Sequence, residues 1–219
     1  MTSWKKNFLL FGLSGFLVVG CSMDSSKEMK EENSDDNVVS AQENESGNYP
    51  QAVNDTGLTT IGETAKDENG KIILKAVSDS KETLDINPIE ITFKNIKILN
   101  YSPELHLIDY FHGYTEQENQ FNYIKLNITA KNTSKQPVFF NPVAMIELNT
   151  GEKISWEEEF YLEHLNGEYG PGEEKTGTMG FIIDETNIEA IKSFKLSTSE
   201  ILDANEDIIE KPETVHFQF

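Results

Sequence analysis

The chain of 219 residues carries 18 basic and 38 acidic residues, which gives a formal net charge of −20. All of the basic residues are lysines, so the bidentate fork with which arginine grips phosphate is absent. Because phosphate binding depends on clustered cations, this composition excludes nucleic acid as a partner.

The N-terminus has the features of an export signal. Lys5 and Lys6 form a small basic region, and the 12 positions Phe8–Val19 are apolar apart from two glycines and a serine. This run fits the roughly 7–15 residues of a signal-peptide apolar region and is shorter than the about 20 that span a membrane. The small residue Gly20 then precedes Cys21. We therefore predict that residues 1–20 are a cleaved signal peptide.

Cys21 is the only cysteine of the chain. An unpaired thiol is unusual in an exported protein, because extracytoplasmic compartments favour disulfides. The segment Val18–Cys21 resembles the lipobox of bacterial lipoproteins. That resemblance implies lipidation of Cys21 with a diacylglyceryl group carrying fatty acids such as palmitate, and a lipid-anchored location on the extracytoplasmic face of the cell membrane. An ordinary signal peptide beside a chance cysteine, or an uncleaved anchor, are the open alternatives.

Residues 21–57 are predicted to be a disordered acidic tether that starts at the lipidated cysteine. From position 22 to position 57 the segment holds nine acidic residues, two lysines and a single aromatic residue, Tyr49. So few apolar groups cannot offset the entropy cost of ordering. As a flexible coil the tether would span about 33 Å, which would hold the following domain away from the membrane.

The chain from residue 58 onward is patterned as short strands. Asp67–Gly70 is a tight-turn signal before a strand at Lys71–Val77. The next strand, Ile89–Leu99, changes its apolar phase in the middle, which predicts a β-bulge at Lys94 and Asn95.

Later segments alternate in the same way, interrupted by a strand with a helical turn over residues 154–165 and a glycine-rich loop over residues 166–174. The later strands are expected at Phe121–Lys131, Pro137–Leu148, Lys175–Ile183, around Phe194 and Leu196, and at Val215–Phe219. The side chains expected in the core are Ile124, Leu126, Ile128, Phe140, Ile146, Phe181, Phe194 and Phe217.

Short strands separated by turn residues, without a long amphipathic helix, predict an all-β protein with an antiparallel β-sandwich. The domain is expected to span residues 58–219, with its core starting at about residue 70.

Five turn and strand motifs also follow one another in this region: Phe93-Lys94-Asn95-Ile96, Tyr123-Ile124-Lys125-Leu126, Lys131-Asn132-Thr133-Ser134, Asn149-Thr150-Gly151-Glu152 and Pro171-Gly172-Glu173-Glu174-Lys175-Thr176-Gly177. Their order resembles the immunoglobulin-like domain of many lipoproteins of Gram-positive bacteria. That family has no characterised function and is sometimes labelled after a telomeric repeat-binding factor. The resemblance implies an immunoglobulin-like β-sandwich in an extracytoplasmic location, and it supplies no catalytic residues.

We find no arrangement of residues that is typical of catalysis, so the protein is expected not to be an enzyme and to need no cofactor. The single cysteine is assigned to lipid, and the four histidines are not spaced as metal ligands on a helix face. The acidic run Glu157–Glu159 is interpreted as a solvated edge.

A calcium loop is imitated by Asp203, Asn205 and Asp207. However, Ile208 stands where such a loop requires glycine, and Thr214 stands where it requires glutamate. We interpret the segment as an acidic surface turn and expect no metal site.

Aromatic residues are concentrated in two expected connections between strands. Tyr110, Phe111 and Tyr114 lie in one connection, and Trp156 lies in the other. Because aromatic residues are enriched at contact hot spots, these four form a candidate binding surface. The interpretation that we favour is that Tyr110 and Phe111 plug one end of the sandwich, since large aromatic side chains dominate core burial.

The sequence is compatible with two functions. The first is a non-enzymatic, membrane-anchored binding or interaction module at the cell envelope, whose partner is an envelope protein or a wall component. The alternative is a small-ligand or metal-binding lipoprotein that serves a transporter or sensor, for which a concave apolar pocket with convergent polar groups is expected.

Overall fold

The structure is a computed structural model that describes residues 51–117 and 119–219. The predicted signal peptide, the lipidation site Cys21 and most of the predicted tether lie outside the described residues. The elements in chain order are β1 (Thr64–Asp67), β2 (Gly70–Ser78), β3 (Glu82–Ile86), β4 (Ile89–Pro103), the 3-10 helix η1 (Leu105–Leu107), α1 (Ile108–Phe111), β5 (Phe121–Asn132), β6 (Val138–Phe140), β7 (Met145–Leu148), β8 (Lys153–Ser155), η2 (Trp156–Glu158), β9 (Gly167–Tyr169), β10 (Glu174–Ile183), η3 (Ile188–Ala190), β11 (Ser193–Ser197), β12 (Ile201–Leu202), β13 (Ile208–Glu210) and β14 (Thr214–Gln218).

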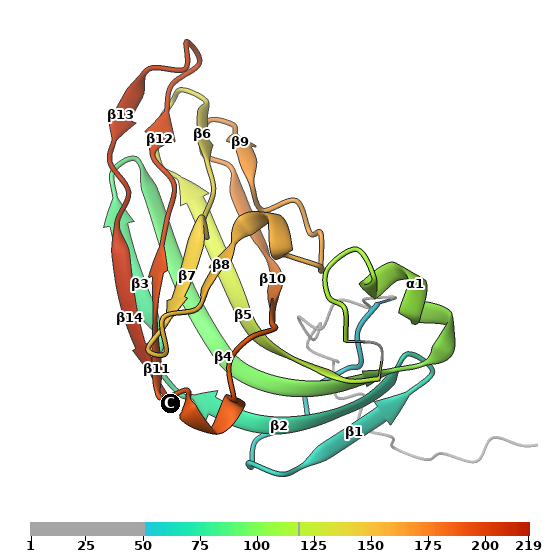
Figure 1. The fold of residues 1–219 in the computed structure, drawn as a ribbon. Coiled ribbons are helices and arrows are strands. Elements are labelled where there is room, and N and C mark those ends of the chain that lie inside the picture. Colours follow the sequence, from blue (N-terminus) through green and yellow to red (C-terminus); the bar gives the residue numbers. More distant parts are fainter. Residues whose placement is uncertain (1–50, 118) are drawn as a thin grey trace, which may run out of the picture. The chain divides into compact units, whose positions relative to one another are not determined.

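Among the described residues, six strands form one layer, an antiparallel sheet in which five strands have the order β1-β2-β4-β5-β10 and the sixth, β3, pairs with β4 (Figure 1). The long strand β4 pairs with β5 along one edge. Along its other edge, the first part of β4 pairs with β3 and the second part pairs with β2. The predicted tight turn is confirmed, and it joins β2 to a preceding strand that was not predicted, β1, with Asp67 paired to Gly70. The pair β4–β5 is therefore the centre of this sheet.

The opposing layer consists, in the described part of the chain, of two four-stranded sheets that continue each other. Their orders are β14-β11-β7-β8 and β13-β12-β6-β9. The chain passes from one sheet to the other between β6 and β7, between β8 and β9, between β11 and β12, and between β13 and β14. The two sheets therefore form one interrupted layer, which supports the sandwich-like, all-β prediction.

The interruption corrects one predicted strand. The segment Pro137–Leu148 is divided into β6 and β7, because Pro142 lacks the N–H group that a central strand must donate. One hydrogen bond to a side chain and one between backbone groups bridge the break. The Asn141 amide donates to Ser199 Oγ at 2.8 Å, and the Ser199 amide donates to the Asn141 carbonyl at 3.0 Å.

The predicted β-bulge in β4 is confirmed. The pairing of β4 with β5 shifts between Lys94 and Lys97, and Asn95 has a φ of 53°. Asparagine tolerates this left-handed conformation better than most residues do. The extra residue puts Ile96 on the same face of the sheet as Phe93, and both side chains are fully buried.

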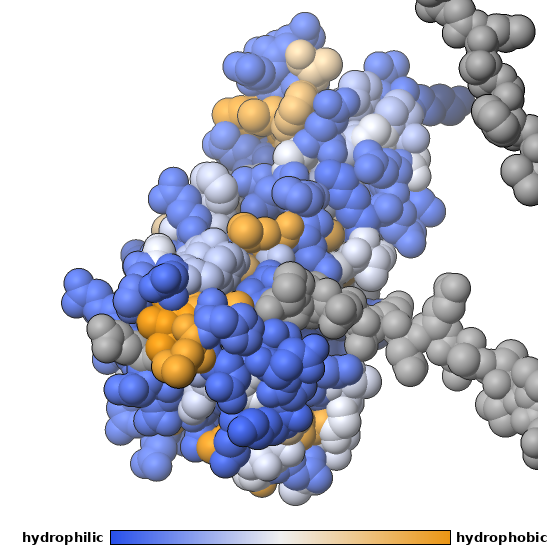
Figure 2. All heavy atoms as spheres, turned by 90° about the vertical axis from the view of Figure 1, so that its right-hand side faces the viewer, coloured by the Kyte–Doolittle hydropathy of each residue, from blue (hydrophilic) through white to orange (hydrophobic). Residues whose placement is uncertain are grey.

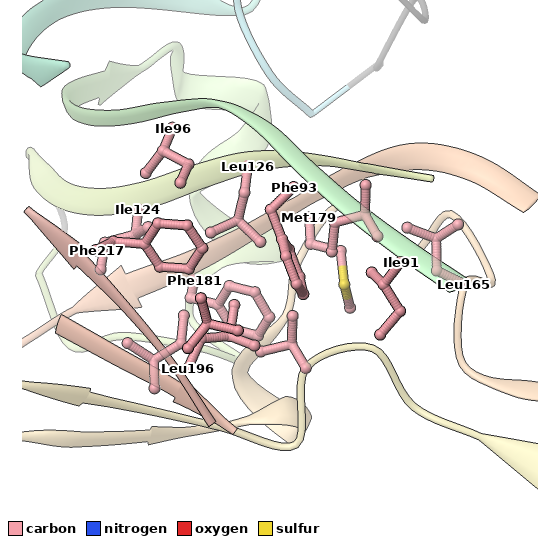
Figure 3. Close-up of a cluster of buried hydrophobic side chains, with 14 of the residues drawn as sticks. Ile91, Phe93, Ile96, Ile124, Leu126, Leu165, Met179, Phe181, Leu196 and Phe217 are labelled. Atoms are coloured by element: carbon pink, nitrogen blue, oxygen red, sulfur yellow. The ribbon is translucent and has the colours of Figure 1, made fainter. Parts of the chain in front are cut away.

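The main core lies between the two layers, and side chains from both sheets of the second layer reach it (Figure 3). The burial of all eight core residues predicted from the sequence is confirmed: Ile124, Leu126, Ile128, Phe140, Ile146, Phe181, Phe194 and Phe217.

A second core lies on the other face of the six-stranded sheet. Ile98 and Ile124 belong to the main core, whereas their strand neighbours Leu99 and Tyr123 belong to the second. Because successive residues of a strand point to opposite faces, both faces of this part of the sheet are buried. The sequence analysis did not predict this second core.

The predicted domain boundary at residue 57 is too late, because residues 51–57 already pack into the domain. Ala52 and Val53 are buried in the second core, and Gln51 and Asp55 are buried as well. The loop predicted at residues 166–174 also needs correction, since it contains the short strand β9. Within the described residues, no helix has the length and apolarity needed to cross a membrane.

The bulge yields a first prediction. Asn95→Gly is expected to keep the stability of the domain, because glycine adopts positive φ readily. Asn95→Val is expected to lower the free energy of unfolding by about 1–3 kcal/mol, because a β-branched residue is strained there. Urea unfolding followed by circular dichroism measures both changes. Equal stabilities of the two variants would show that the bulge does not depend on the left-handed residue.

Candidate functional site

The first eight described residues, 51–58, cross the second core; we call them the N-terminal strap. The side-chain amide of Gln51 donates to the carbonyls of Phe160 and Tyr161, at 3.1 and 2.8 Å. The Tyr101 hydroxyl donates to the Gln51 carbonyl at 3.2 Å, and the Asn69 side chain donates to the Ala52 carbonyl at 3.2 Å. Hydrogen bonds to the domain thus hold the strap at Gln51, through its side chain and its carbonyl, and at Ala52, through its carbonyl.

Asp55 of the strap forms a buried ion cluster with Lys97 and Lys125. The two lysines face each other across β4 and β5 in directly paired positions. Lys97 Nζ lies 2.9 Å from Asp55 Oδ2 and donates to the Asp55 carbonyl at 2.9 Å, while Lys125 Nζ contacts Asp55 Oδ1. Asp55 is 4% exposed and each lysine is 8% exposed, so all three charges are shielded from solvent.

The electrostatics of the cluster explain how it stays charged. Burial raises the pKa of the Asp55 carboxyl, but the ammonium groups of Lys125 and then Lys97 outweigh burial and hold this pKa below its usual value. Burial lowers the pKa of Lys125, and the Asp55 carboxylate opposes this change. Both carboxylate oxygens are already occupied by lysines, so the cluster acts as an anchor for the strap rather than as a proton-transfer group.

The structure brings together Tyr110, Phe111 and Tyr114 of the candidate binding surface. The Phe111 ring is 2% exposed. It packs against four other rings at centroid distances of 5.5, 5.1, 4.8 and 5.4 Å: Tyr101, Tyr110, Phe121 and Phe160. Phe111 is therefore buried, but it belongs to the second core on the other face of the six-stranded sheet and does not plug an end of the sandwich, as the sequence had been interpreted.

The two tyrosines of this group keep part of their surface accessible. The Tyr110 hydroxyl donates to the Phe160 carbonyl at 2.6 Å, and burial raises the pKa of Tyr110 well above its usual value. The Tyr114 ring lies 5.5 Å from the Tyr110 ring. Their role in binding a partner stays a prediction.

Trp156 begins the short helix η2 and is 46% exposed. The nearby Glu159 does not lie on a solvated edge, as the sequence analysis expected, but is 7% exposed. Its carboxylate accepts hydrogen bonds from the backbone amides of Tyr161, Leu162 and Gly180. Burial raises the pKa of Glu159, and these hydrogen bonds oppose the change. Glu159 therefore fixes the loop after η2 to β10.

Two glycines of β10, Gly177 and Gly180, let this loop approach closely. A Cβ atom at position 180 would lie 2.5 Å from the Tyr161 ring, and one at position 177 would meet the Glu163 carboxylate. A pocket of about 130 Å³ lies beside the loop, lined by Glu159, Leu162, Glu163, His164, Leu165, Asn166 and Met179. Small-molecule sites usually enclose roughly 300–1,000 Å³, so this pocket is too small for a metabolite-sized ligand.

The described ranges 51–117 and 119–219 contain no group of three His, Cys, Asp or Glu side chains that could hold a metal ion. The segment that imitates a calcium loop forms the turn of the β12–β13 hairpin. There Asp203 Oδ1 accepts hydrogen bonds from the amides of Asn205 and Asp207, at 2.7 and 3.0 Å. The Asp203 carboxylate therefore serves to hold the backbone of this turn through hydrogen bonds.

These features define a class: an all-β, sandwich-like domain of antiparallel sheets with a second aromatic core closed by an N-terminal strap. Residues 59–204 match the family described as "Domain of unknown function (DUF4352)", and the chain belongs to this family.

The chain is also similar to other proteins. The "Uncharacterized protein YdhF" of Bacillus subtilis (strain 168) is 31% identical over 225 residues, covering 93% of this chain and 95% of that protein. A functionally unknown protein from Listeria monocytogenes EGD-e has a similar crystal structure, with a TM-score of 0.53 and 14% identity over 68% of this chain and 87% of that one. A "putative lipoprotein (ycdA)" from Bacillus subtilis is more distant, with a TM-score of 0.41 and 18% identity over 64% of this chain and 39% of that one.

The ion cluster yields a second prediction. Asp55→Asn is expected to lower the free energy of unfolding by about 3–5 kcal/mol, because it leaves two buried ammonium groups without a counter-charge. In a Lys97→Met, Lys125→Met background the same change is expected to cost much less. The exposed Asp85→Asn is the matched control and should change stability by less than about 0.5 kcal/mol. Urea unfolding at neutral pH measures these values, and equal costs in both backgrounds would contradict the proposed coupling.

The pH dependence provides a check on the same cluster. Because the folded-state pKa of Asp55 is below the unfolded value of about 3.9, its stabilisation is present above that pH. It is lost as the pH falls through the folded pKa. The Asp55→Asn variant should lack this acid-dependent loss.

The aromatic residues yield a third prediction. Phe111→Ala is expected to cost about 3–5 kcal/mol of stability, because the ring is buried among other rings. Trp156→Ala is expected to cost less than about 1 kcal/mol, because much of its side chain is exposed. Thermal unfolding of the two variants makes the comparison. A larger loss for Trp156→Ala would refute the assignment of Phe111 to the core.

Proposed function

We propose that this protein is a lipoprotein anchored at the extracytoplasmic face of the cell membrane, where it acts as a non-enzymatic interaction module. The single observation that carries the proposal is the sequence of the N-terminus: a basic pair, a short apolar run, and Gly20 before the lone Cys21. On this proposal, the membrane is contacted through the lipid on Cys21. The partner of the folded domain is an envelope protein or a wall component.

The folded domain supports an interaction role. Its buried charged groups Asp55, Lys97, Lys125 and Glu159 are engaged in fixing the strap and the loop after η2. The face seen in Figure 2 is largely hydrophilic, with apolar side chains gathered in separate patches. Apolar patches rimmed by polar residues are places where a partner can bind. The motifs quoted above further support an immunoglobulin-like type of sandwich.

The alternative function, service to a transporter or sensor, needs a larger concave site for a small ligand than the pocket beside Glu159, or a cluster of ligating side chains for a metal ion, and residues 51–117 and 119–219 hold no group of three such side chains. We therefore favour the interaction module.

The anchor yields a fourth prediction. When the gene is expressed in a Gram-positive host grown with labelled palmitate, the wild-type protein should carry the label and fractionate with membranes. Cys21→Ser should carry no label, because the acceptor thiol is gone. Ser22→Ala is the matched control and should be labelled like the wild type. Continued labelling of Cys21→Ser would overturn the proposal, and a labelled protein of unprocessed mass would indicate an uncleaved anchor.

A further inference from the structure

An apolar row crosses the outer face of the sheet β13-β12-β6-β9. Phe139 in β6 pairs with Leu202 in β12, and Leu202 pairs in turn with Ile208 in β13. Directly paired residues lie on the same face of a sheet. The strand neighbours Phe140 and Ile201 point into the main core, so the row faces outward.

The row is accessible to solvent at a prominent end of the domain. Phe139 is 37% exposed and Ile208 is 58% exposed, and the adjacent Ile209 is 43% exposed. The strands that carry the row lie at the upper end of the fold in Figure 1, whereas β1 and β2 lie at the lower end and α1 lies at the right-hand side. The row is therefore separate from the aromatic second core.

The strand β13 adds a second feature, an edge that can accept another strand. It is the outermost strand of its described sheet, and all three of its residues are exposed. An edge strand presents backbone N–H and C=O groups that can pair with an added chain. β13 has the sequence Ile-Ile-Glu and is followed by Lys211 and Pro212, so its edge combines two exposed apolar residues with charges and a proline that limit pairing to a short segment. The Asp203 carboxylate holds the preceding turn in place.

The surroundings of this edge are strongly acidic. Between positions 200 and 213 the single basic residue is Lys211, and the acidic residues are Glu200, Asp203, Glu206, Asp207, Glu210 and Glu213. On the other side of the row, Glu168 in β9 pairs with Phe139. A second copy of the chain would bring the same negative charge to this edge, so charge complementarity favours a basic partner.

We propose that the edge of β13 and the adjoining apolar row bind an extended protein segment in which apolar side chains alternate with lysine or arginine. The backbone of the segment pairs with β13. Its apolar side chains continue the row at Ile208, and its basic side chains meet the acidic residues around the hairpin. This inference rests on the proposed interaction function and names its surface and the chemistry of its partner.

The proposal is tested with the full-length protein, purified in a non-ionic detergent, and three labelled peptides. The first alternates lysine and valine over eight residues, the second replaces every lysine by glutamate, and the third is the lysine peptide with N-methylated backbone amides on one edge. Fluorescence anisotropy should show binding of the lysine peptide at least about tenfold tighter than that of the glutamate peptide. The N-methylated peptide should bind weakly, because it cannot complete the strand pairing. Amide hydrogen exchange of β13 should slow when the lysine peptide binds.

Ile208→Ser should weaken binding of the lysine peptide by about fivefold or more, since it removes an apolar contact of the row. Ile61→Ser is the matched control, because Ile61 is 64% exposed and lies outside this sheet. Equal loss in both variants, equal binding of the lysine and glutamate peptides, or no binding would overturn the proposal. Self-association that depends on Ile208 would overturn it in favour of a second copy as the occupant. None of these results depends on palmitate labelling at Cys21, so failure here is distinguishable from failure of the anchor.

Discussion

The rest of the structure depends on the extra residue at Asn95 in the middle of β4. A β-strand sends alternate side chains to opposite faces, and a shift of one residue exchanges the two faces. The bulge makes this exchange once, within a single strand. As a result, Ile98 lies in the main core, whereas Leu99 and Tyr101 lie in the second core.

The same shift creates the need for the strap. It sets Lys97 directly opposite Lys125 on the face of the sheet that carries the second core. Two ammonium groups on a buried face are unfavourable unless an anion and hydrogen-bond acceptors accompany them. The strap supplies the Asp55 carboxylate and backbone carbonyl for this purpose. A buried ion cluster adds little net stability compared with apolar packing, and its value here is that one carboxylate fixes where the strap lies.

The parts of the fold that could be predicted are those coded by local pattern. The alternation around Leu126 identified β5 and its buried face, and the phase change near Asn95 identified the bulge. Asp55 could not be recognised, because its partners are 42 and 70 positions away in the sequence. Lys125 in an alternating strand has the pattern of a solvent-facing residue. The one local signal was the apolar pair Ala52-Val53, which is out of place in a disordered acidic tether.

Other differences have the same origin. Glu159 resembles its two acidic neighbours in sequence, and its burial follows from three backbone amides that only the folded loop brings to it. Phe111 could be assigned either to a surface or to a core from its neighbours alone, and the contact with Tyr101 and Phe121 decides in favour of the core. The interruption at Pro142 was visible as a proline. That this proline divides the segment between two sheets could not be seen from the sequence, because it depends on the strands with which β6 and β7 pair.

The strap also determines how the domain responds to mechanical tension. A pull on the chain from its N-terminal side reaches Gln51 before it reaches any strand of the described domain. The strap is fastened at successive points, first at Gln51, then at Ala52 and Val53, then at Asp55. A load on it is therefore borne by one fastening after another, as in peeling, and not by many hydrogen bonds in parallel, as in shearing a sheet. The sandwich behind the strap is spared until Asp55 has left its lysines.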